Sequence, residues 1–479
     1  MSAAPILSAM AGGALGIAGV VVVSFFLLFH TAMATLLVSA LPELWRQWDL
    51  TDDEALAPIM RSEALPTVSV VVTGRAGRLW TTATLRTLLA LRYPRHEVVL
   101  VHDGEASGFL RTLIEHFDLY QVPPAILVSV PTGPVRGYYR SRRHGKLFVI
   151  DKPHTGHADD LNAALNASRF PYVLTMDVST HLEPQALTRL MRPFLLGEPV
   201  ASVAGTTRVG HGAHPTAPQE VVAGVPVRLL DGVQAVEQLR DRIYVRLGWN
   251  RFGGRLPDGG TVMLHRREQL LELDGYRTGV ADPERDLVRR LRAALRGRLA
   301  TAVPTLPDAV AWRLAPERLR LVAEHRAMGH RHRIEELLAW RAAPDASAAT
   351  TGKRAALVLA VLTLAPVMEL LGYLLLVVAL LRDGPAAPFV ALFLLAVPGY
   401  AVLLSLWAVA FEWASAGTLR SWRDVARLCV FAVAEQLGYR QRIMWARLRA
   451  TGAAGVYLSG WRRATRAGHG PSLTCRPDA

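Results

Sequence analysis

Two stretches of the chain carry carboxylates at positions typical of ligand binding in α/β proteins. Residues 155–166 read Thr-Gly-His-Ala-Asp-Asp-Leu-Asn-Ala-Ala-Leu-Asn, which places Asp159 at the start of a predicted helix. Asp177 directly follows the apolar run 172–176, which predicts a buried strand. Open α/β sheets bind ligands outside the carboxyl ends of their strands. We therefore expect both carboxylates at such an edge.

Asp103 is a third carboxylate of this kind, because it follows the apolar run Glu97–His102 and precedes Gly104. We expect Asp103, Asp159 and Asp177 to converge on one pocket. A structural explanation stays open for two of them. Asp103 could simply form an Asp-Gly turn, and Asp159 could be a first-turn acid that interacts with the helix dipole.

The elements that would position these acids alternate between strands and helices. Apolar runs predict strands at Val68–Thr73, Glu97–His102, Ala125–Val130, Tyr172–Met176 and Ala201–Gly205, and helical spacing is found at Trp80–Arg92, Ser107–Leu119, Ala158–Ser168, Pro184–Leu196, Leu229–Leu247, Arg285–Leu295 and Glu317–Trp340. This order predicts an α/β domain over residues 66–342, with a mostly parallel sheet that is covered on both faces.

Apolar segments near both ends predict a membrane protein. Of the 479 residues, 1–42 contain no Asp, Glu, Lys or Arg, 355–381 contain only Glu369, and 386–411 contain none. Each segment can cross a hydrocarbon core about 30 Å thick. The first lacks a basic start and is too long for a signal peptide, so we expect an uncleaved transmembrane anchor. Glu369 is either functional or paired with a basic residue of the last helix.

The charged residues set the expected orientation and partners. Because Arg is abundant between the apolar segments, the positive-inside rule places the middle region in the cytoplasm, on a multi-pass protein of the cell (inner) membrane. Residues 421–450 predict an Arg-containing helix that lies in the interface or spans the membrane, followed by a basic tail at 451–479. We expect contact with membrane lipids, and no nucleic-acid binding, because aromatic and basic residues are not interleaved.

The sequence resembles the membrane-bound processive-type glycosyltransferases of family 2, which include cellulose, hyaluronan and poly-N-acetylglucosamine synthase-like enzymes. The resemblance rests on the order and spacing of several segments, namely 68–72, 85–105, 156–166, 172–184, 264–277, 366–376 and 435–441. It implies a GT-A fold (the nucleotide-diphospho-sugar transferase fold), a UDP-sugar donor, a divalent Mg²⁺ or Mn²⁺ ion, inversion at the anomeric carbon, and a glycan or lipid-linked acceptor.

The resemblance also assigns roles to individual residues. Asp103 and Asp159 match donor-binding carboxylates, and Asp177 matches the first acid of the family's metal-binding Asp-x-Asp. The second acid of that motif is replaced by Ser179, so the implied metal site of Asp177 and Ser179 loses one negative charge. Mg²⁺ and Mn²⁺ prefer hard oxygen ligands, and we expect weakened metal binding.

Two further positions depart from the family pattern. Glu284 stands where the family has its catalytic base, an Asp in a Glu-Asp pair, and Asp282 and Asp286 are alternatives. The Gln-x-x-Arg-Trp clamp aligns with residues 325–329, which contain no Trp, although Arg326 is close by.

The sequence keeps some motifs of the family and lacks others, and two functions are compatible with this combination. One is an active transferase that moves a sugar from a nucleotide-sugar donor to an acceptor. The other is a catalytically degenerate relative that binds a nucleotide or a partner synthase subunit in polysaccharide synthesis. The linked changes at the metal, base and clamp positions keep the second reading open.

Overall fold

The structure, a computed structural model, describes residues 4–50, 61–63, 65–74, 78–104, 107–123, 126–210, 225–248, 262–280, 282–295, 303–314, 316, 318–342, 350–381, 387–415 and 421–452. These residues fall into two compact units. The sheet unit contains the described residues of Ser39–Gly224 and Arg246–Ala315, and the helical unit contains those of Met1–Val38, Val225–Val245 and Pro316–Pro471. The expected domain 66–342 is thus divided between the two units, and most of the expected tail 451–479 lies outside the described residues.

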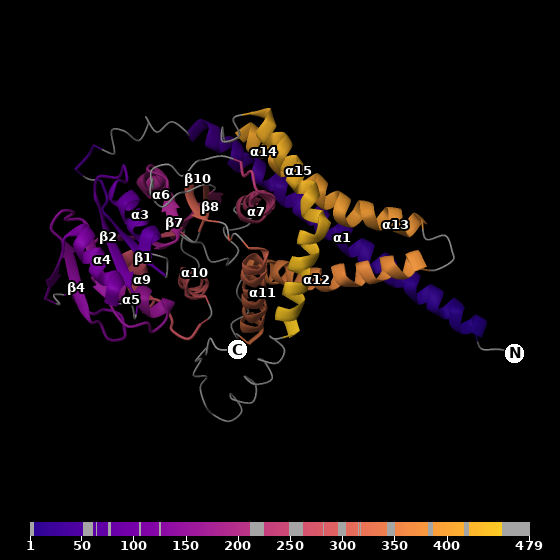
Figure 1. Ribbon diagram of the computed structural model, residues 1–479, viewed down its shortest axis with the longest axis horizontal. Helices are drawn as coiled ribbons and strands as arrows, with labels where there is room; N and C mark the ends of the chain where they lie inside the picture. The colour runs from indigo at the N-terminus through magenta and orange to yellow at the C-terminus, as the bar shows by residue number, and fades with distance from the viewer. Residues whose placement is uncertain are drawn as a thin grey trace, which may run out of the picture. The chain divides into compact units, whose positions relative to one another are not determined.

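In the described part of the sheet unit, ten strands form one sheet in the order β3-β4-β5-β2-β1-β6-β9-β8-β10-β7 (Figure 1). Their bounds are β1 Val68–Thr73, β2 His96–His102, β3 Leu119–Val122, β4 Gly137–Ser141, β5 Leu147–Asp151, β6 Tyr172–Asp177, β7 Thr180–Leu182, β8 Ser202–Gly210, β9 Val262–Arg266 and β10 Thr305–Leu314. The central strands β5, β2, β1 and β6 are parallel. Antiparallel strands flank them, with β4 beside β5 and β9 beside β6. The α/β class is confirmed, and a second parallel pair, β8 and β10, lies beyond β9.

Helices cover both faces of the central strands. On one face, Val70 and Val72 of β1 join a core with α3 (Arg78–Leu89), α4 (Ser107–Phe117) and α6 (Ala186–Leu195). On the other face, Val71 joins a core with α5 (His157–Ala167), α9 (Arg267–Glu272) and α10 (Pro283–Ala294). Because successive side chains of a strand point to opposite faces, both sets of residues have to be apolar. This burial explains why the central strands are continuous apolar runs.

The strand predicted at Ala125–Val130 is wrong, because residues 126–130 form no strand. The side chain of Asn166 takes the place of a neighbouring strand there. Its Oδ1 accepts hydrogen bonds from the backbone N–H groups of Ser129 (3.0 Å) and Val130 (2.9 Å), and its amide donates to the Val130 carbonyl (2.8 Å). The strand that pairs with β2 is instead β5, which the sequence analysis did not predict.

The helical unit contains the membrane-spanning candidates. Its elements are the first part of α1 (Ala4–Leu50), α7 (Leu229–Arg240), the π-helix η1 (Asp241–Leu247), α11 (Leu319–Ala342), α12 (Thr350–Leu381), α13 (Ala387–Leu394), η2 (Leu395–Gly399), α14 (Tyr400–Ser415), α15 (Trp422–Ala434) and η3 (Glu435–Tyr439). In Figure 1, α12 to α15 run from orange to yellow. Among the residues that the structure describes, three stretches are long and apolar enough to cross a membrane, namely Gly16–Pro42, Ala360–Leu381 and Phe389–Ala414, which agrees with the predicted spans.

Ion pairs connect the last helices to these apolar stretches. Glu369, in the middle of the α12 stretch, is buried and accepts from the Nε of Arg440 at 2.6 Å. This contact confirms pairing with the last helical segment, one of the two readings of Glu369 from the sequence. Arg240 of α7 similarly contacts Glu435 (2.6 Å) and the Ser405 hydroxyl (2.6 Å) of α14. Buried charged groups are costly unless they are paired, which explains these contacts.

We expect Arg440→Met to destabilise the protein by about 3–5 kcal/mol, because it leaves the buried carboxylate of Glu369 without its cation. Thermal unfolding of the full chain in detergent should report a lower midpoint. The double variant Arg440→Met/Glu369→Leu should recover most of the loss. Arg320→Met is the matched control, since Arg320 pairs with Glu324 on an exposed face and should change stability by less than about 1 kcal/mol. Equal midpoints for Arg440→Met and the wild type would contradict a stabilising role of this ion pair.

Candidate functional site

The candidate site lies at the carboxyl edge of the four parallel strands. β1 is followed by Gly74, β2 by Asp103 and β5 by Lys152, while β6 ends at Asp177. The strands are in register at this edge, where Thr73 pairs with Asp177 and His102 with Asp151. Helix α5, which carries Asp159 in its first turn, begins at the same edge after Gly156. The fold therefore collects side chains from four strand ends and one helix start.

A fully buried lysine lies beside two of the acids. The Nζ of Lys152 donates to Asp159, to Oδ1 of Asp160 at 2.9 Å and to the hydroxyl of Thr155 at 2.6 Å. Burial raises the pKa of Asp159, but hydrogen bonds from Lys152, Thr155 and the backbone N–H of Gly133 outweigh it and hold that pKa below its usual value. Burial raises the pKa of Asp160 to about 6, although Lys152 opposes the shift.

Arg136 neutralises the acid at the end of β5. Its Nε and one terminal nitrogen donate to both oxygens of Asp151, at 2.8 and 2.7 Å. The same terminal nitrogen donates to the carbonyls of Gly104 (2.7 Å) and Lys152 (2.8 Å). Arg136 thus ties the segments that follow β2 and β5 to each other, and it fixes the backbone beside Asp103.

Asp103 contacts a histidine at the mouth of the site. Oδ2 of Asp103 lies 2.7 Å from Nδ1 of His154, and the carboxylate is buried while the imidazole is about half exposed. One ligand atom each from Asp103, His154 and Asp160 lie within 4.8 Å of one another. These groups are close enough together to bind one metal ion.

Asp177 and Ser179 lie next to each other, as the sequence predicted. Oδ1 of Asp177 accepts from the backbone N–H of Ser179 at 2.7 Å and from its hydroxyl. The other carboxylate oxygen lies against Gly74, whose φ is 102°. A Cβ at Gly74 would be 2.7 Å from this oxygen, so the position requires glycine. The pair offers a carboxylate and a hydroxyl, which are hard oxygen ligands suited to a divalent cation.

His157 connects the remaining acids. Burial lowers the pKa of His157, and the negative charges of Asp177, Asp282 and Asp103 partly oppose this shift. Asp159 lies near these acids as well, because the next residue, Asp160, has a carboxylate oxygen within 4.8 Å of one in Asp103. The structure therefore brings the three predicted donor-binding acids to one edge, and it adds Asp282, which caps α10.

The three candidate bases at the start of α10 have different environments. Asp286 is bound by Arg289 (2.6 Å) and Arg290 (2.7 Å), so its carboxylate is already engaged. Asp282 accepts the backbone N–H of Arg285 at 3.0 Å as the helix N-cap. Glu284 is half-buried in the first turn, and its charge acts on Tyr276, whose pKa is raised first by burial and then by Glu284. Of the three, Asp286 is therefore the poorest proton acceptor.

Arg326, near the expected clamp, lies in the helical unit. Its guanidinium donates to Oε2 of Glu237 at 2.8 and 3.1 Å, and the hydroxyl of Tyr439 donates to the same oxygen at 2.8 Å. Its charge thus holds α7, α11 and η3 together.

Four residues of the site were not predicted from the sequence, namely Lys152, Arg136, His154 and Asp160. One signal for Lys152 was present, since lysine occurs only at positions 146, 152 and 353 in a chain with 54 basic residues. A rare lysine directly after an apolar run marks a strand end. The other three residues have no such local signal.

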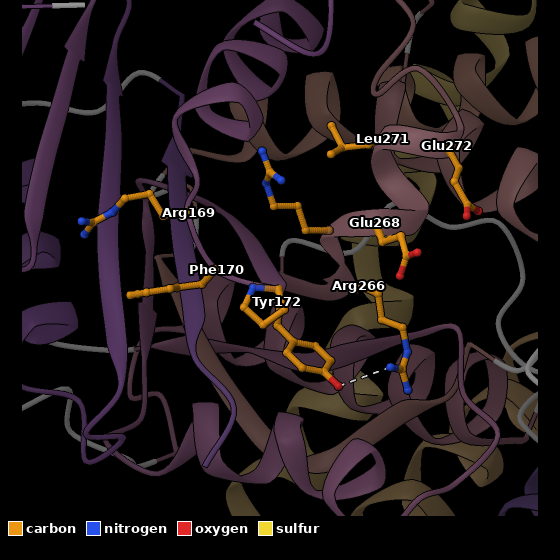
Figure 2. Close-up of a pocket in the computed structure, with 9 residues that line it drawn as sticks. Arg169, Phe170, Tyr172, Arg266, Glu268, Leu271 and Glu272 are labelled. Atoms are coloured by element: carbon orange, nitrogen blue, oxygen red, sulfur yellow. Dashed lines mark hydrogen bonds between the residues drawn. The ribbon is translucent and has the colours of Figure 1, made fainter. Parts of the chain in front are cut away.

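Figure 2 shows a hollow whose lining includes the start of β6, so that it lies at the edge of the sheet opposite the carboxyl ends of the parallel strands. It has a volume of about 580 Å³. One part of its lining is the segment Arg169–Tyr172, which leads into β6, and the other part comes from the last residue of β9 and from α9. Arg266 lies over the rings of Tyr172 and Phe194, and its guanidinium donates to the Tyr172 hydroxyl at 3.4 Å. The site acids are not among its lining residues.

Neither the family models nor the sequences of characterised proteins match this chain. Similar solved structures include mannosyltransferase PcManGT from Pyrobaculum calidifontis in complex with GDP-Man and Mn²⁺, with 16% identity over 87% of this chain and 99% of that chain and a TM-score of 0.46. Another is S. aureus TarS 1–349 in complex with UDP-GlcNAc (13% identity, 78% and 92% covered, TM-score 0.37). A third is glucosyl-3-phosphoglycerate synthase from Mycobacterium tuberculosis with Mn²⁺, UDP and phosphoglyceric acid (16%, 56% and 77%, TM-score 0.32).

Lys152→Met should destabilise the protein by about 3–5 kcal/mol, because it removes the cation beside two buried carboxylates. Denaturant unfolding at neutral pH measures the loss. Lys146→Met is the matched control, since Lys146 is exposed and donates only to the carbonyl of Pro94. If both variants unfold at the same denaturant concentration, Lys152 does not stabilise the site.

Proposed function

We propose that the protein is a membrane glycosyltransferase that transfers a sugar from a nucleotide-sugar, a UDP-sugar, to a glycan or lipid-linked acceptor with inversion. The observation that carries this proposal is the convergence of Asp103, Asp159 and Asp177 at the carboxyl edge of the parallel strands. The sequence motifs that contain these acids are the ones that resemble the family. The site chemistry, rather than the fold, supports the activity.

The donor would bind through the three acids. Carboxylates accept hydrogen bonds, so Asp103 suits the N–H and O–H groups of a base and ribose, and Asp159 suits further donor hydroxyls. A divalent Mg²⁺ or Mn²⁺ ion on Asp177 and Ser179 would neutralise charge on the diphosphate leaving group. Since Ser179 supplies no charge, Asp177 is the main protein ligand in this proposal.

The transfer needs a base for the acceptor hydroxyl. In the proposed step the acceptor oxygen forms a bond to the anomeric carbon while the bond from that carbon to the diphosphate breaks, and the hydroxyl proton passes to a carboxylate. We assign this carboxylate to Glu284, which stands at the family's base position in the first turn of α10. Asp282 remains the alternative, because its charge also reaches His157 among the donor acids.

Glu284→Gln should lower turnover by at least about 100-fold while nucleotide binding persists, because it keeps the shape of the side chain but removes the proton acceptor. UDP release from several UDP-sugars by the purified full chain measures turnover, and calorimetry with UDP and Mn²⁺ measures binding. Glu268→Gln is the control, since this exposed glutamate lines the hollow at the opposite edge. Full turnover in Glu284→Gln and none in Asp282→Asn would transfer the role to Asp282.

A second function is favoured by specific departures from the family pattern. Ser179 replaces a metal carboxylate, and Arg326 is bound to Glu237. A degenerate relative that binds nucleotide or a partner synthase subunit would show these changes. Nucleotide binding without turnover of any common UDP-sugar would favour this function over transfer.

The proposal includes a location. The three apolar stretches would make the protein multi-pass in the inner membrane, and the Arg-rich middle region would place the sheet unit in the cytoplasm. Membrane lipids are then among its partners.

Protease added to intact cells should leave the sheet unit uncut, since the membrane would shield it, whereas permeabilised cells should release it. Immunoblotting against an epitope tag measures the cleavage. Cleavage in intact cells would contradict the cytoplasmic location.

A further inference from the structure

We propose that Asp103, His154 and Asp160 form a binding site for a divalent transition-metal ion, separate from the position at Asp177 and Ser179. The site lies at the same edge of the sheet as the proposed donor site and shares Asp103 with it. The inference rests on the proposed function only through this shared residue. The family resemblance assigns a metal role to neither His154 nor Asp160.

The geometry of the three side chains carries the proposal. One ligand atom from each lies within 4.8 Å of the others, and Oδ2 of Asp103 is 2.7 Å from Nδ1 of His154. Two ligands at right angles around an ion about 2.1 Å away are about 3 Å apart. Asp103 and His154 already have nearly this spacing. A small rotation of the half-exposed His154 would bring the set together.

The surrounding contacts leave ligand atoms for an ion. Asp160 bonds to Lys152 through Oδ1, and a carboxylate has a second oxygen with its own lone pairs. The single positive charge of Lys152 is shared between two carboxylates, those of Asp159 and Asp160. Arg136 is bound to both oxygens of Asp151. Because buried charges are costly unless offset, a divalent cation would add to the stabilisation that these two cations give to the carboxylates at this edge.

The ligand types select the metal. Two carboxylate oxygens alone would suit Mg²⁺ or Mn²⁺, but an added imidazole nitrogen shifts the preference away from Mg²⁺ and toward Co²⁺ and Zn²⁺, with Mn²⁺ in between. The exposed ring of His154 lies at the mouth of the site, whereas Asp103 and Asp160 are buried, so an ion can enter from solvent past the imidazole. At Asp177 and Ser179, by contrast, both ligands are oxygens. The two positions should therefore differ in selectivity.

The test is calorimetric titration of the full chain in detergent with MnCl₂, ZnCl₂ and MgCl₂, without nucleotide. We expect Zn²⁺ and Mn²⁺ to bind at least about 10-fold more tightly than Mg²⁺. His154→Ala should weaken Zn²⁺ and Mn²⁺ binding by about 10-fold or more. Loss of a residue that only hydrogen-bonds to a metal ligand already lowers metal affinity by about that factor, and His154 would be a ligand itself. Co²⁺ bound to the wild type should show a visible absorption spectrum that His154→Ala changes.

Two control variants separate the alternatives. His144→Ala removes an exposed histidine that precedes β5, at the opposite edge of the sheet, and should leave binding unchanged. Ser179→Ala, at the other proposed metal position, tests whether Zn²⁺ binds there instead. Equal Zn²⁺ affinity in His154→Ala and the wild type, or a loss confined to Ser179→Ala, would overturn the proposal. An absence of any Zn²⁺ or Mn²⁺ binding would also overturn it and leave His154 as a hydrogen-bond partner of Asp103.

The experiment is independent of the proposed function. Because no nucleotide is present, metal binding that requires His154 would stand even if the protein transfers no sugar. Conversely, UDP binding and turnover in a His154→Ala variant with unchanged metal affinity would leave the glycosyltransferase proposal intact and remove only this site. Unchanged thermal unfolding of His154→Ala, expected for a half-exposed side chain, shows that the fold is retained.

Discussion

The ammonium group of Lys152 is completely buried, and it contacts the carboxylates of Asp159 and Asp160 in the first turn of α5. Two adjacent acids at a buried helix start would repel each other, and burial alone would favour their neutral forms. The lysine opposes both effects. Its position is fixed because Lys152 directly follows β5 in the middle of the sheet, where its backbone N–H donates to the carbonyl of His102 at 3.0 Å. Asp103 and His154 lie close to Asp160, one of the two acids that this charge holds.

The parallel strands supply the second constraint. Since β5, β2, β1 and β6 all end at one edge, four backbone segments arrive within reach of the same volume. Acids that follow these strands must then be accommodated at close range. Gly74 and Gly133 allow this, because a Cβ at either position would come within 2.7 or 3.0 Å of an Asp177 or Asp159 oxygen. The density of acids at the site depends on glycine at these turns.

Charged residues serve a different purpose in the helical unit. Glu237 accepts from Arg326 and Tyr439, Arg240 binds Glu435, and Arg440 binds Glu369, so each pair joins elements that are distant in sequence. Such pairs add little net stability when complete, but they are costly to break, and they specify which helices meet. Arginines that look available for ligand binding in the sequence are thus engaged in holding helices together.

The sequence by itself determined the local features. Asp103 and Asp177 follow apolar runs, Asp159 opens a helix, and the uncharged stretches have the length of a membrane span; each is decided by neighbouring residues and backbone period, which a linear pattern contains. The order of strands and helices likewise indicated the α/β class. Only the tertiary structure decided what depends on contacts between distant segments. Asn166 satisfies the backbone of residues 129 and 130, which made an apolar run that reads as a strand into a loop. Lys152, Arg136 and His154 are partners of the acids because the sheet brings their segments together. Neighbouring residues in the sequence do not determine which positively charged group a buried carboxylate contacts.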